Sequence, residues 1–249
     1  MKKLICTALT LIMLICATLG VTQNALANDV FNIEYGTDVE GYVYIATDGS
    51  TYRVHQYDFE VPANGKVTLT FYGFSGDSSS KKQRLKCSFY KRGKNAMLKE
   101  FKTKLDATQT GAYYSIAKKT YSVKRGPTYG FGMAPAYYDT GIQYTVTFKY
   151  KPNAPKIKAL TSKKRRARVK WSTVKGVTGY TIQYSRSKNF KKITTVKTYS
   201  DKDYAKYTKK LKKGKKYYFR VRSFVIQAGQ NSSKTYNSKW SAKKSIVIK

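Results

Sequence analysis

Few residues in this chain have the types and spacing that catalysis requires. His55 is its one histidine, so a nucleophile activated by an imidazole base would have to sit beside it. It stands at the start of a strand-like segment, where we expect a solvent-facing or hydrogen-bonded structural histidine. No Gly-x-Ser-x-Gly or His-Glu-x-x-His motif occurs anywhere in the sequence. Nucleophilic and zinc-dependent hydrolysis are therefore not expected.

Two pairs of carboxylates leave one enzymatic alternative open. Asp38 with Glu40, and Asp58 with Glu60, are each separated by one residue and so would share one face of a strand. Glycoside hydrolysis uses such a pair when both acids face a cleft, but on strands these spacings are more often a solvated face. The histidine, cysteines and carboxylates are scattered singly and do not show metal-ligand spacing. We predict a non-enzymatic protein with no metal and no cofactor.

Basic residues provide the strongest functional signal. The chain has a formal net charge of +36. Residues 154–249 contain 29 basic and 2 acidic residues, a net charge of +27, whereas residues 28–153 contain 18 and 11, a net charge of +7. A surface with such an excess of one sign repels itself and attracts anions. The candidate polyanion-binding residues are Lys163, Lys164, Arg165, Arg166, Lys209, Lys210, Lys212, Lys213, Lys215, Lys216, Arg220 and Arg222.

The partner that this charge predicts is an anionic cell-wall polymer, such as a teichoic acid, or an acidic glycan. A protein partner and a merely solvating surface stay open as alternatives. Single-stranded nucleic acid is a further alternative, because Tyr218 and Phe224 could stack on bases from the exposed face of a strand, but no recognised nucleic-acid motif supports it. A glycan-binding accessory module of a secreted enzyme system is another. The tyrosines that could stack on sugar rings in that case are Tyr113, Tyr114, Tyr129, Tyr137 and Tyr138.

The beginning of the chain has the organisation of a secretory signal. Met1-Lys2-Lys3 is positively charged, Leu4 to Val21 is an apolar run, and Ala25-Leu26-Ala27 is a small-residue cleavage site. We expect residues 1–27 to be removed and the protein to be secreted, either free or associated with the cell surface. No later segment is apolar over the ~20 residues that a membrane span requires.

After that cleavage Cys87 would be the one remaining cysteine, so an intrachain disulfide could not form. Leu85, Cys87 and Phe89 alternate along one segment. This pattern predicts a strand with the thiol on its apolar face, buried and unreactive.

Alternating apolar residues predict an all-β fold of two antiparallel β-sandwich domains after the signal segment, comprising residues 28–153 and 154–249. In the first domain, alternation marks strands around residues 57–61, 67–71, 85–90, 129–133 and 144–148; in the second, around 167–171, 180–184, 192–198, 205–209, 217–223 and 246–248. Pro152 and Pro155 mark the boundary. No segment maintains a helical period.

The second domain resembles a fibronectin type III domain, an immunoglobulin-like sandwich. The resemblance rests on Trp171, on Gly179-Tyr180, on Leu211 and Tyr217 on either side of Gly214, and on Trp240-Ser241. It implies a tyrosine corner, in which the Tyr217 hydroxyl bonds to nearby backbone. The Lys- and Tyr-rich composition is similar to the versions exported by Gram-positive bacteria, which implies a spacer or binding module without catalytic residues.

The first domain resembles the bacterial pre-peptidase C-terminal domain, a jelly-roll sandwich often attached to secreted enzymes. The similar stretches are Tyr57 to Thr70, Gly126 to Phe131 and Asp139 to Val146. That family usually has an acidic pair before its first aromatic strand, where this chain has His55-Gln56. A metal site at that edge is therefore not implied.

Overall fold

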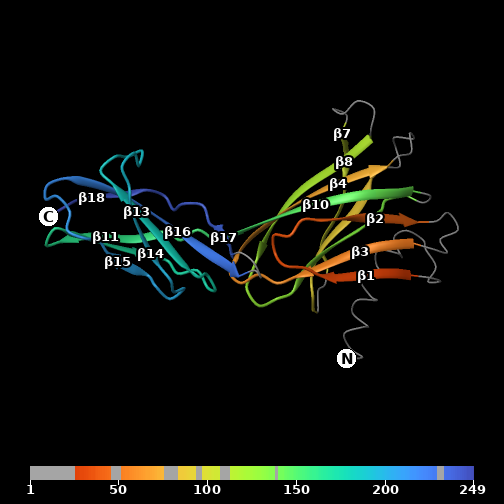
Figure 1. The fold of residues 1–249 in the computed structure, drawn as a ribbon, viewed down its shortest axis with the longest axis horizontal. Coiled ribbons are helices and arrows are strands. Elements are labelled where there is room, and N and C mark those ends of the chain that lie inside the picture. The colour runs from red at the N-terminus through yellow and green to blue at the C-terminus, as the bar shows by residue number, and fades with distance from the viewer. Residues whose placement is uncertain are drawn as a thin grey trace. The chain divides into compact units, whose positions relative to one another are not determined.

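The structure is a computed structural model, which describes residues 26–45, 52–75, 84–93, 97–106, 113–137, 140–228 and 233–249 (Figure 1). The expected secretory signal, residues 1–27, lies outside this part of the chain apart from Leu26 and Ala27, where the first strand begins. Among the described residues there is no helix with the length and apolarity needed to span a membrane.

The described residues form β-strands joined by turns and loops, as the sequence predicts. The strand pairings whose register is described are antiparallel, except that β1 pairs in parallel with β3. Both sheet systems pack as β-sandwiches. The strands are β1 (Leu26–Asn32), β2 (Val39–Ile45), β3 (Tyr52–Phe59), β4 (Gly65–Ser75), β5 (Leu85–Lys91), β6 (Met97–Lys102), β7 (Lys104–Asp106), β8 (Tyr113–Val123), β9 (Tyr129–Pro135), β10 (Thr140–Pro152), β11 (Ile157–Lys163), β12 (Arg166–Trp171), β13 (Gly179–Ser185), β14 (Thr194–Thr198), β15 (Ala205–Tyr207), β16 (Lys216–Ala228), β17 (Ser233–Asn237) and β18 (Lys244–Val247).

The chain divides into two compact units. The first runs to Glu60 and also contains Thr68–Tyr121 and Gly126–Lys149. The second contains Val61–Val67, Ser122–Arg125 and Tyr150–Lys249. It thus includes two short segments, 61–67 and 122–125, that the sequence predicts to be part of the first domain.

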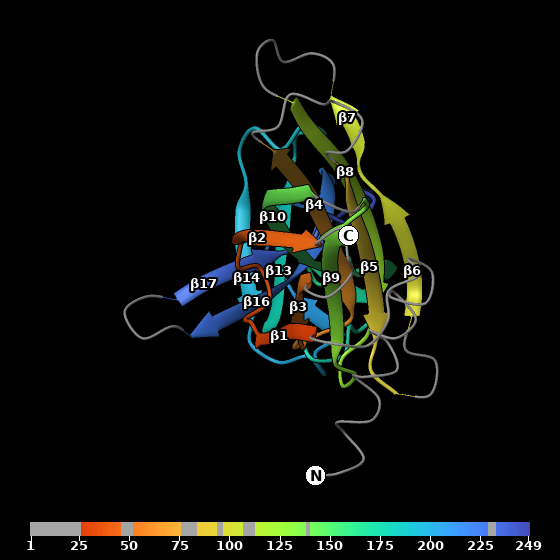
Figure 2. The same ribbon diagram turned by 90° about the vertical axis from the view of Figure 1, so that its right-hand side faces the viewer.

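In the first unit one large sheet bends back on itself. Its strand order is β6-β5-β9-β3-β2-β10-β4-β8-β7, and β1 pairs in parallel with β3. Figure 2 shows β6, β5 and β9 side by side. Phe131 of β9 and Phe148 of β10 are not on neighbouring strands, yet their ring centroids lie 6.1 Å apart at an interplanar angle of 84°. The two halves of the sheet therefore face each other across an aromatic core.

Strands β5 and β9 are buried on both faces, which differs from the one-sided alternation that the sequence predicts. Every residue of β9 is buried, as is every residue of β5 except Lys91. The second face is covered because the ring of Tyr90 on β5 lies over Gly130 of β9, where an added Cβ atom would overlap the ring. The glycine makes space for a large ring on the second face of the strand, so both faces are covered.

The second unit is a sandwich of two sheets, with orders β11-β12-β15 and β14-β13-β16-β17, and β18 pairs with β16. Trp171 of β12 packs against Tyr180 of β13, with ring centroids 5.4 Å apart. The Tyr180 hydroxyl accepts a hydrogen bond from Val174 N at 2.7 Å and donates to Asp201 O at 3.1 Å. Both phenol and ring are thus fixed in the core.

The expected contact of Tyr217 with nearby backbone is confirmed. Its hydroxyl accepts a hydrogen bond from Lys212 N at 3.3 Å, and both Leu211 and Tyr217 are buried. Gly214 turns the chain between them with a φ of +72°, a conformation that glycine adopts without strain. The residues before β16 are therefore tied to its first turn.

The outward face of β16 is less exposed than the sequence predicts. Tyr218, Arg220 and Arg222 are half-buried, and Phe224 is 3% exposed. The Phe224 ring lies edge-on to Tyr199, with centroids 5.7 Å apart, and the Lys197 ammonium stands 5.8 Å from its centre. The expectation that Phe224 is open to solvent is wrong, because the segment after β14 covers it.

Replacing Tyr217 with phenylalanine should lower the stability of the second unit by about 0.5–1.5 kcal/mol, because the ring stays buried while its hydrogen bond is removed. Both tryptophans, Trp171 and Trp240, belong to this unit, so tryptophan fluorescence of the full chain reports its urea unfolding. Tyr218→Phe, on the half-exposed face, is the control. Equal unfolding midpoints for the two variants would contradict a structural role for the corner.

The Cys87 thiol should react slowly with a thiol reagent in the native protein and quickly in denaturant. Cys87 is completely buried, and burial raises the pKa of its thiol well above the ordinary value. Peptide mass mapping after timed labelling measures modification at this residue separately from Cys6 and Cys16. Rapid native labelling, or a dimer that dissociates on reduction, would contradict this environment.

Candidate functional site

The structure brings together the two groups of basic residues, 163–166 and 209–216, that lie far apart in the sequence. Leu211 N donates to Arg165 O at 2.7 Å, and Arg165 Nε donates to Leu211 O at 3.2 Å. Thr208 N also donates to Ala167 O at 2.9 Å. The turn between β11 and β12 therefore lies against the segment that leads into β16.

That turn has an uncommon backbone conformation. Lys164 and Arg165 have positive φ angles of 48° and 61°, as a two-residue hairpin turn of the primed type requires. Residues other than glycine adopt it at some cost in energy. Arg165 N donates to Lys249 O at 2.9 Å, so the conformation is supported from outside the hairpin. The positions of these cations are thus fixed at the backbone.

The last residues of the chain extend the same surface. Gly214 N donates to Ile248 O at 2.8 Å, and Ile248 N donates to Lys215 O at 3.1 Å. The loop before β16 is therefore held between the 163–166 turn and residues 248–249. Lysine ammonium groups are free to move around this fixed backbone, because their long side chains rotate readily.

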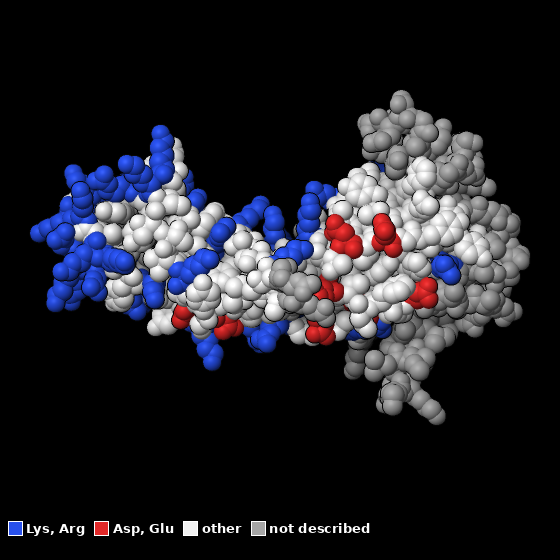
Figure 3. All heavy atoms as spheres, viewed as in Figure 1, with Lys and Arg blue, Asp and Glu red and all other residues white. Residues whose placement is uncertain are grey.

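We call the resulting surface the basic end. Its ten basic residues are all exposed. Figure 3 shows Lys and Arg side chains gathered over the part of the second unit where Figure 1 marks the C-terminus. They are Lys163, Lys164, Arg165, Arg166, Lys209, Lys210, Lys212, Lys213, Lys215 and Lys216.

The two acids of residues 154–249 lie away from the basic end. In the β12–β15 pairing Lys170 is opposite Ala205, whereas Arg168 is opposite Tyr207. Asp201 and Asp203 precede Ala205 and are therefore near the opposite end of β12 from Arg166. Asp201 Oδ2 accepts a hydrogen bond from Gly176 N at 3.0 Å, which fixes the turn before β13. Within the described ranges, the ion pairs found all belong to the first unit.

The other two candidate residues, Arg220 and Arg222, lie on the outward face of β16 in a different environment. The Arg220 guanidinium is stacked between Phe190 and Trp240, 4.1 and 4.3 Å from their ring centres, and Arg222 lies 4.6 Å from the centre of Trp240. Arg220 also donates to Gln183 Oε1 from Nε at 3.0 Å and from Nη2 at 2.7 Å. Burial lowers the pKa of both guanidinium groups, although they remain charged at neutral pH.

Trp240 is held over these arginines by the serines on either side of it. Ser223 N donates to Ser238 Oγ at 3.0 Å, and Val221 N donates to Ser241 Oγ at 3.0 Å. The serine side chains thus accept the hydrogen bonds that a neighbouring strand would otherwise accept from this part of β16. Their contacts show that Arg220 and Arg222 pack against aromatic rings and Gln183. A role for them in polyanion binding stays a prediction.

The Asp58 and Glu60 carboxylates are engaged in structural contacts. Asp58 is buried, accepts a hydrogen bond from the Tyr90 hydroxyl at 2.7 Å and forms an ion pair with Arg92. Glu60 accepts from the Thr128 hydroxyl at 2.9 Å.

In the other pair, Asp38 accepts a hydrogen bond from Phe148 N at 2.7 Å, and Glu40 is exposed. Three of these four carboxylates, those of Asp38, Asp58 and Glu60, are thus engaged in hydrogen bonds or an ion pair.

His55 is a buried member of a hydrogen-bonded network. Its Nδ1 hydrogen-bonds to the Tyr144 hydroxyl, which lies 2.7 Å from the Tyr57 hydroxyl, and its Nε2 is 3.5 Å from Asp29 Oδ2. Burial lowers the pKa of His55, the Asp29 carboxylate opposes this, and Arg53 reinforces it. The expectation of a hydrogen-bonded structural histidine is confirmed. Across the described residues, His, Cys, Asp and Glu do not gather in a group that could ligate a metal.

The tyrosines named for sugar stacking do not form a common surface in the described part of the chain. Tyr129 is buried, and Tyr137 is half-buried beside the Lys102 ammonium, 5.3 Å from its ring centre. The side chains of Tyr113, Tyr114 and Tyr138 lie outside the described residues.

No protein-family model matches this chain, and no curated protein sequence matches it. Several solved structures are similar to parts of this chain at low sequence identity. The pre-peptidase C-terminal domain of a collagenase from Bacillus anthracis is 12% identical, covering 49% of this chain and 96% of its own, with a TM-score of 0.33. A cytokine receptor complex is 15% identical, covering 73% and 95% with a TM-score of 0.38, and a myokine structure is 18% identical, covering 39% and 98% with a TM-score of 0.31.

Replacing Arg220 with glutamine should destabilise the second unit by about 2 kcal/mol, because the change removes a charged double hydrogen bond and two stacking contacts. Tryptophan fluorescence during urea unfolding measures this destabilisation. Arg186→Gln is the matched control, since Arg186 is exposed and the change removes the same charge. Equal effects of the two substitutions would show that the stacking contributes nothing.

Proposed function

We propose that this protein is an exported, non-catalytic binding module that associates electrostatically with extracellular anionic polymers, such as teichoic acids of a cell wall or acidic glycans. The observation that carries the proposal is the union of the 163–166 and 209–216 cations in one exposed surface, the basic end. Acidic side chains of residues 154–249 lie elsewhere. A polyanion could therefore contact many cations at once without competing with acidic side chains of the same unit.

The physics of such a surface favours a polymer over a small anion. Flexible, exposed ammonium groups provide charge without a rigid geometry for one ligand. A linear polyanion has condensed counterions, and neutralising its charges releases them, so binding gains entropy and becomes strongly salt-dependent. Near an anionic lipid surface each basic side chain contributes about 1 kcal/mol at physiological salt. We expect a similar gain for each side chain of the basic end that touches the polymer.

We also propose a family character for each unit. The buried Tyr217 corner and the Trp171 core support a fibronectin type III character for the second unit. The sandwich built around Phe131 and Phe148 supports a pre-peptidase C-terminal character for the first. Export rests on the sequence of residues 1–27. Single-stranded nucleic acid is the weaker candidate, because Phe224 is buried and cannot stack on a base.

The proposal predicts that the full chain binds teichoic acid or heparin with an affinity that falls steeply as salt rises. Isothermal titration calorimetry between 50 and 300 mM NaCl gives the slope of log K against log salt. Changing Lys212, Lys213, Lys215 and Lys216 together to Gln should reduce the magnitude of that slope by up to about 3, because each anionic charge that a lysine neutralises adds about 0.7–0.9 to it.

The matched control changes Lys175, Lys191, Lys192 and Lys202 to Gln. These four lysines are also exposed but lie outside the basic end, and the change in net charge is the same. Equal slopes for the two variants would show that net charge alone governs binding. Failure of the unchanged protein to bind any polyanion at 150 mM salt would leave the basic end a solvated surface and overturn the proposal.

A further inference from the structure

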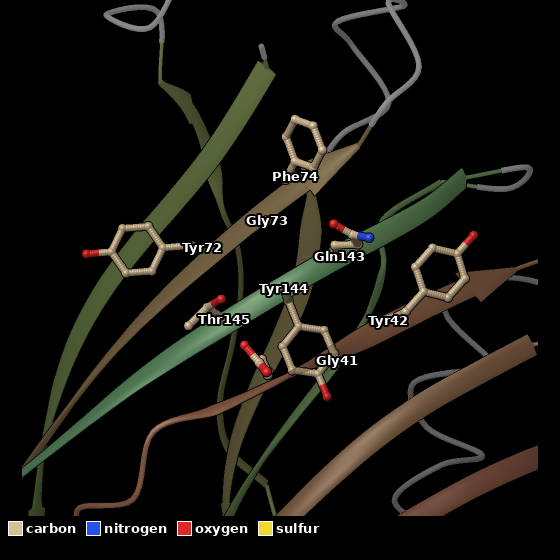
Figure 4. Close-up of a pocket in the computed structure, with 9 residues that line it drawn as sticks. Gly41, Tyr42, Tyr72, Gly73, Phe74, Gln143, Tyr144 and Thr145 are labelled. Carbon is tan, nitrogen blue, oxygen red and sulfur yellow. The ribbon is translucent and has the colours of Figure 1, made fainter.

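The first unit has a cleft with the size and side chains of a binding site. Strands β2, β10 and β4 are neighbours in the sheet, and their outward side chains line a cleft of about 680 Å³. This volume falls within the ~300–1,000 Å³ that ligand sites usually have. Glu40 and Tyr42 come from β2, Gln143 and Thr145 from β10, and Tyr72 and Phe74 from β4 (Figure 4).

Two tyrosines of this cleft leave large aromatic rings in contact with solvent. Tyr42 is 46% exposed and Tyr72 is 39% exposed. The residues that alternate with them, Val43 and Phe71, are completely buried. Tyr42 and Tyr72 therefore belong to the outer face, and the core does not account for them.

The sheet is shaped to hold the Tyr42 ring. A Cβ atom at Gly141 would overlap the Tyr42 hydroxyl, so the ring reaches across β10 at the position where that strand has no side chain. The ring also lies nearly parallel to that of Tyr44, with centroids 6.4 Å apart and an interplanar angle of 24°. One face of Tyr42 is thus supported by the protein before any ligand arrives.

Hydrogen-bonding groups lie between the aromatic rings. Gln143 is directly opposite Tyr42 in the β2–β10 pairing, and Thr145 is directly opposite Glu40. All four residues are exposed. A carboxylate, an amide and a hydroxyl together both donate and accept hydrogen bonds, which suits a ligand rich in hydroxyl groups.

The charge of the cleft distinguishes it from the basic end. Glu40 is the ionisable acid among its lining residues, and in the described part of the chain neither Lys nor Arg lines it. An anionic polymer would meet a negative charge here, and single-stranded nucleic acid binding requires a positive groove. A neutral ligand with both apolar faces and hydroxyl groups fits this combination.

We propose that the outer face of β2, β10 and β4 binds a neutral polysaccharide. Tyr42 and Tyr72 stack on the faces of sugar rings, and Glu40 and Gln143 bond to their hydroxyls. The two tyrosines are on strands separated by one intervening strand, roughly 10 Å apart, so they contact different parts of one glycan chain. This site is independent of the basic end and does not rest on polyanion binding.

The test uses the full chain in 0.5 M NaCl, where electrostatic binding is screened. Sedimentation with insoluble cellulose and chitin, and calorimetry with soluble β-glucan, α-glucan, mannan and xylan, supply the probes. At least one of them should bind. Tyr42→Ala and Tyr72→Ala should each weaken that binding roughly tenfold or more, as removal of an aromatic stack does, whereas Tyr42→Phe should retain it.

Two controls separate this site from folding and from the basic end. Tyr204→Ala removes a tyrosine that is 54% exposed in the second unit and should leave glycan binding unchanged. The variant with Lys212, Lys213, Lys215 and Lys216 changed to Gln should also bind the glycan normally. Circular dichroism checks that each variant is folded.

The proposal is overturned if none of these glycans binds, or if folded Tyr42→Ala and Tyr72→Ala variants bind as the unchanged protein does. Abolished glycan binding in the four-lysine variant would place the interaction at the basic end and would also overturn it. Failure of polyanion binding alone leaves this site unaffected, because the two measurements use different surfaces and different salt.

Discussion

Two hydrogen bonds between Arg165 and Leu211, one from backbone to backbone and one from the Arg165 side chain, hold together two groups of cations that electrostatics alone would separate. At physiological salt, charges interact over about 8 Å, so neighbouring ammonium groups at the basic end repel one another. The core built around Trp171, Tyr180 and Phe219 offsets this repulsion, since these side chains are fully or almost fully buried. An anionic ligand would relieve the same repulsion, which couples binding to stability.

Basic side chains of the second unit lie in two kinds of environment. Those of the basic end project into solvent from turns, loops and strand ends, whereas Arg220 and Arg222 lie flat against Trp240 on the face of a strand. Guanidinium groups suit the second role, because they are planar and more weakly hydrated than ammonium groups. The two groups carry the same charge and differ in exposure. Exposure to solvent therefore distinguishes the cations of the basic end from the packing cations Arg220 and Arg222.

Strands with clean alternation can be predicted from the sequence, and those without it cannot. The segments around Val169, Ile182 and Phe219 form β12, β13 and β16 as expected. Strand β2 is not predicted from the sequence because Gly41 interrupts its alternation of apolar residues. Strand β8 is not predicted because Lys118 and Lys119 interrupt its alternation. The double burial of β9 depends on the Tyr90 ring crossing Gly130, an interaction between segments that no local pattern contains.

The candidate sites show the same limit. Both groups of basic residues can be named from composition, but their union depends on the hairpin register that puts Arg165 beside Leu211. The cleft of the first unit cannot be found in this way. Tyr42 and Tyr72 come from β2 and β4, and β10 lies between these strands although it follows both in the chain. In the sequence alone, an exposed tyrosine on a strand such as Tyr42 or Tyr72 cannot be distinguished from a tyrosine that faces the core.

The position of β10 between β2 and β4 also has a consequence for folding. His55 bonds to Tyr144 across 89 residues, and Asp38 bonds to Phe148 across 110. Closing such long loops is entropically costly, and topologies dominated by distant contacts fold slowly. Until β10 emerges, the edges of β2 and β4 remain unpaired and prone to association with other chains. A chain that is synthesised or translocated from its N-terminus would thus need protection until about residue 150, when its central strand arrives.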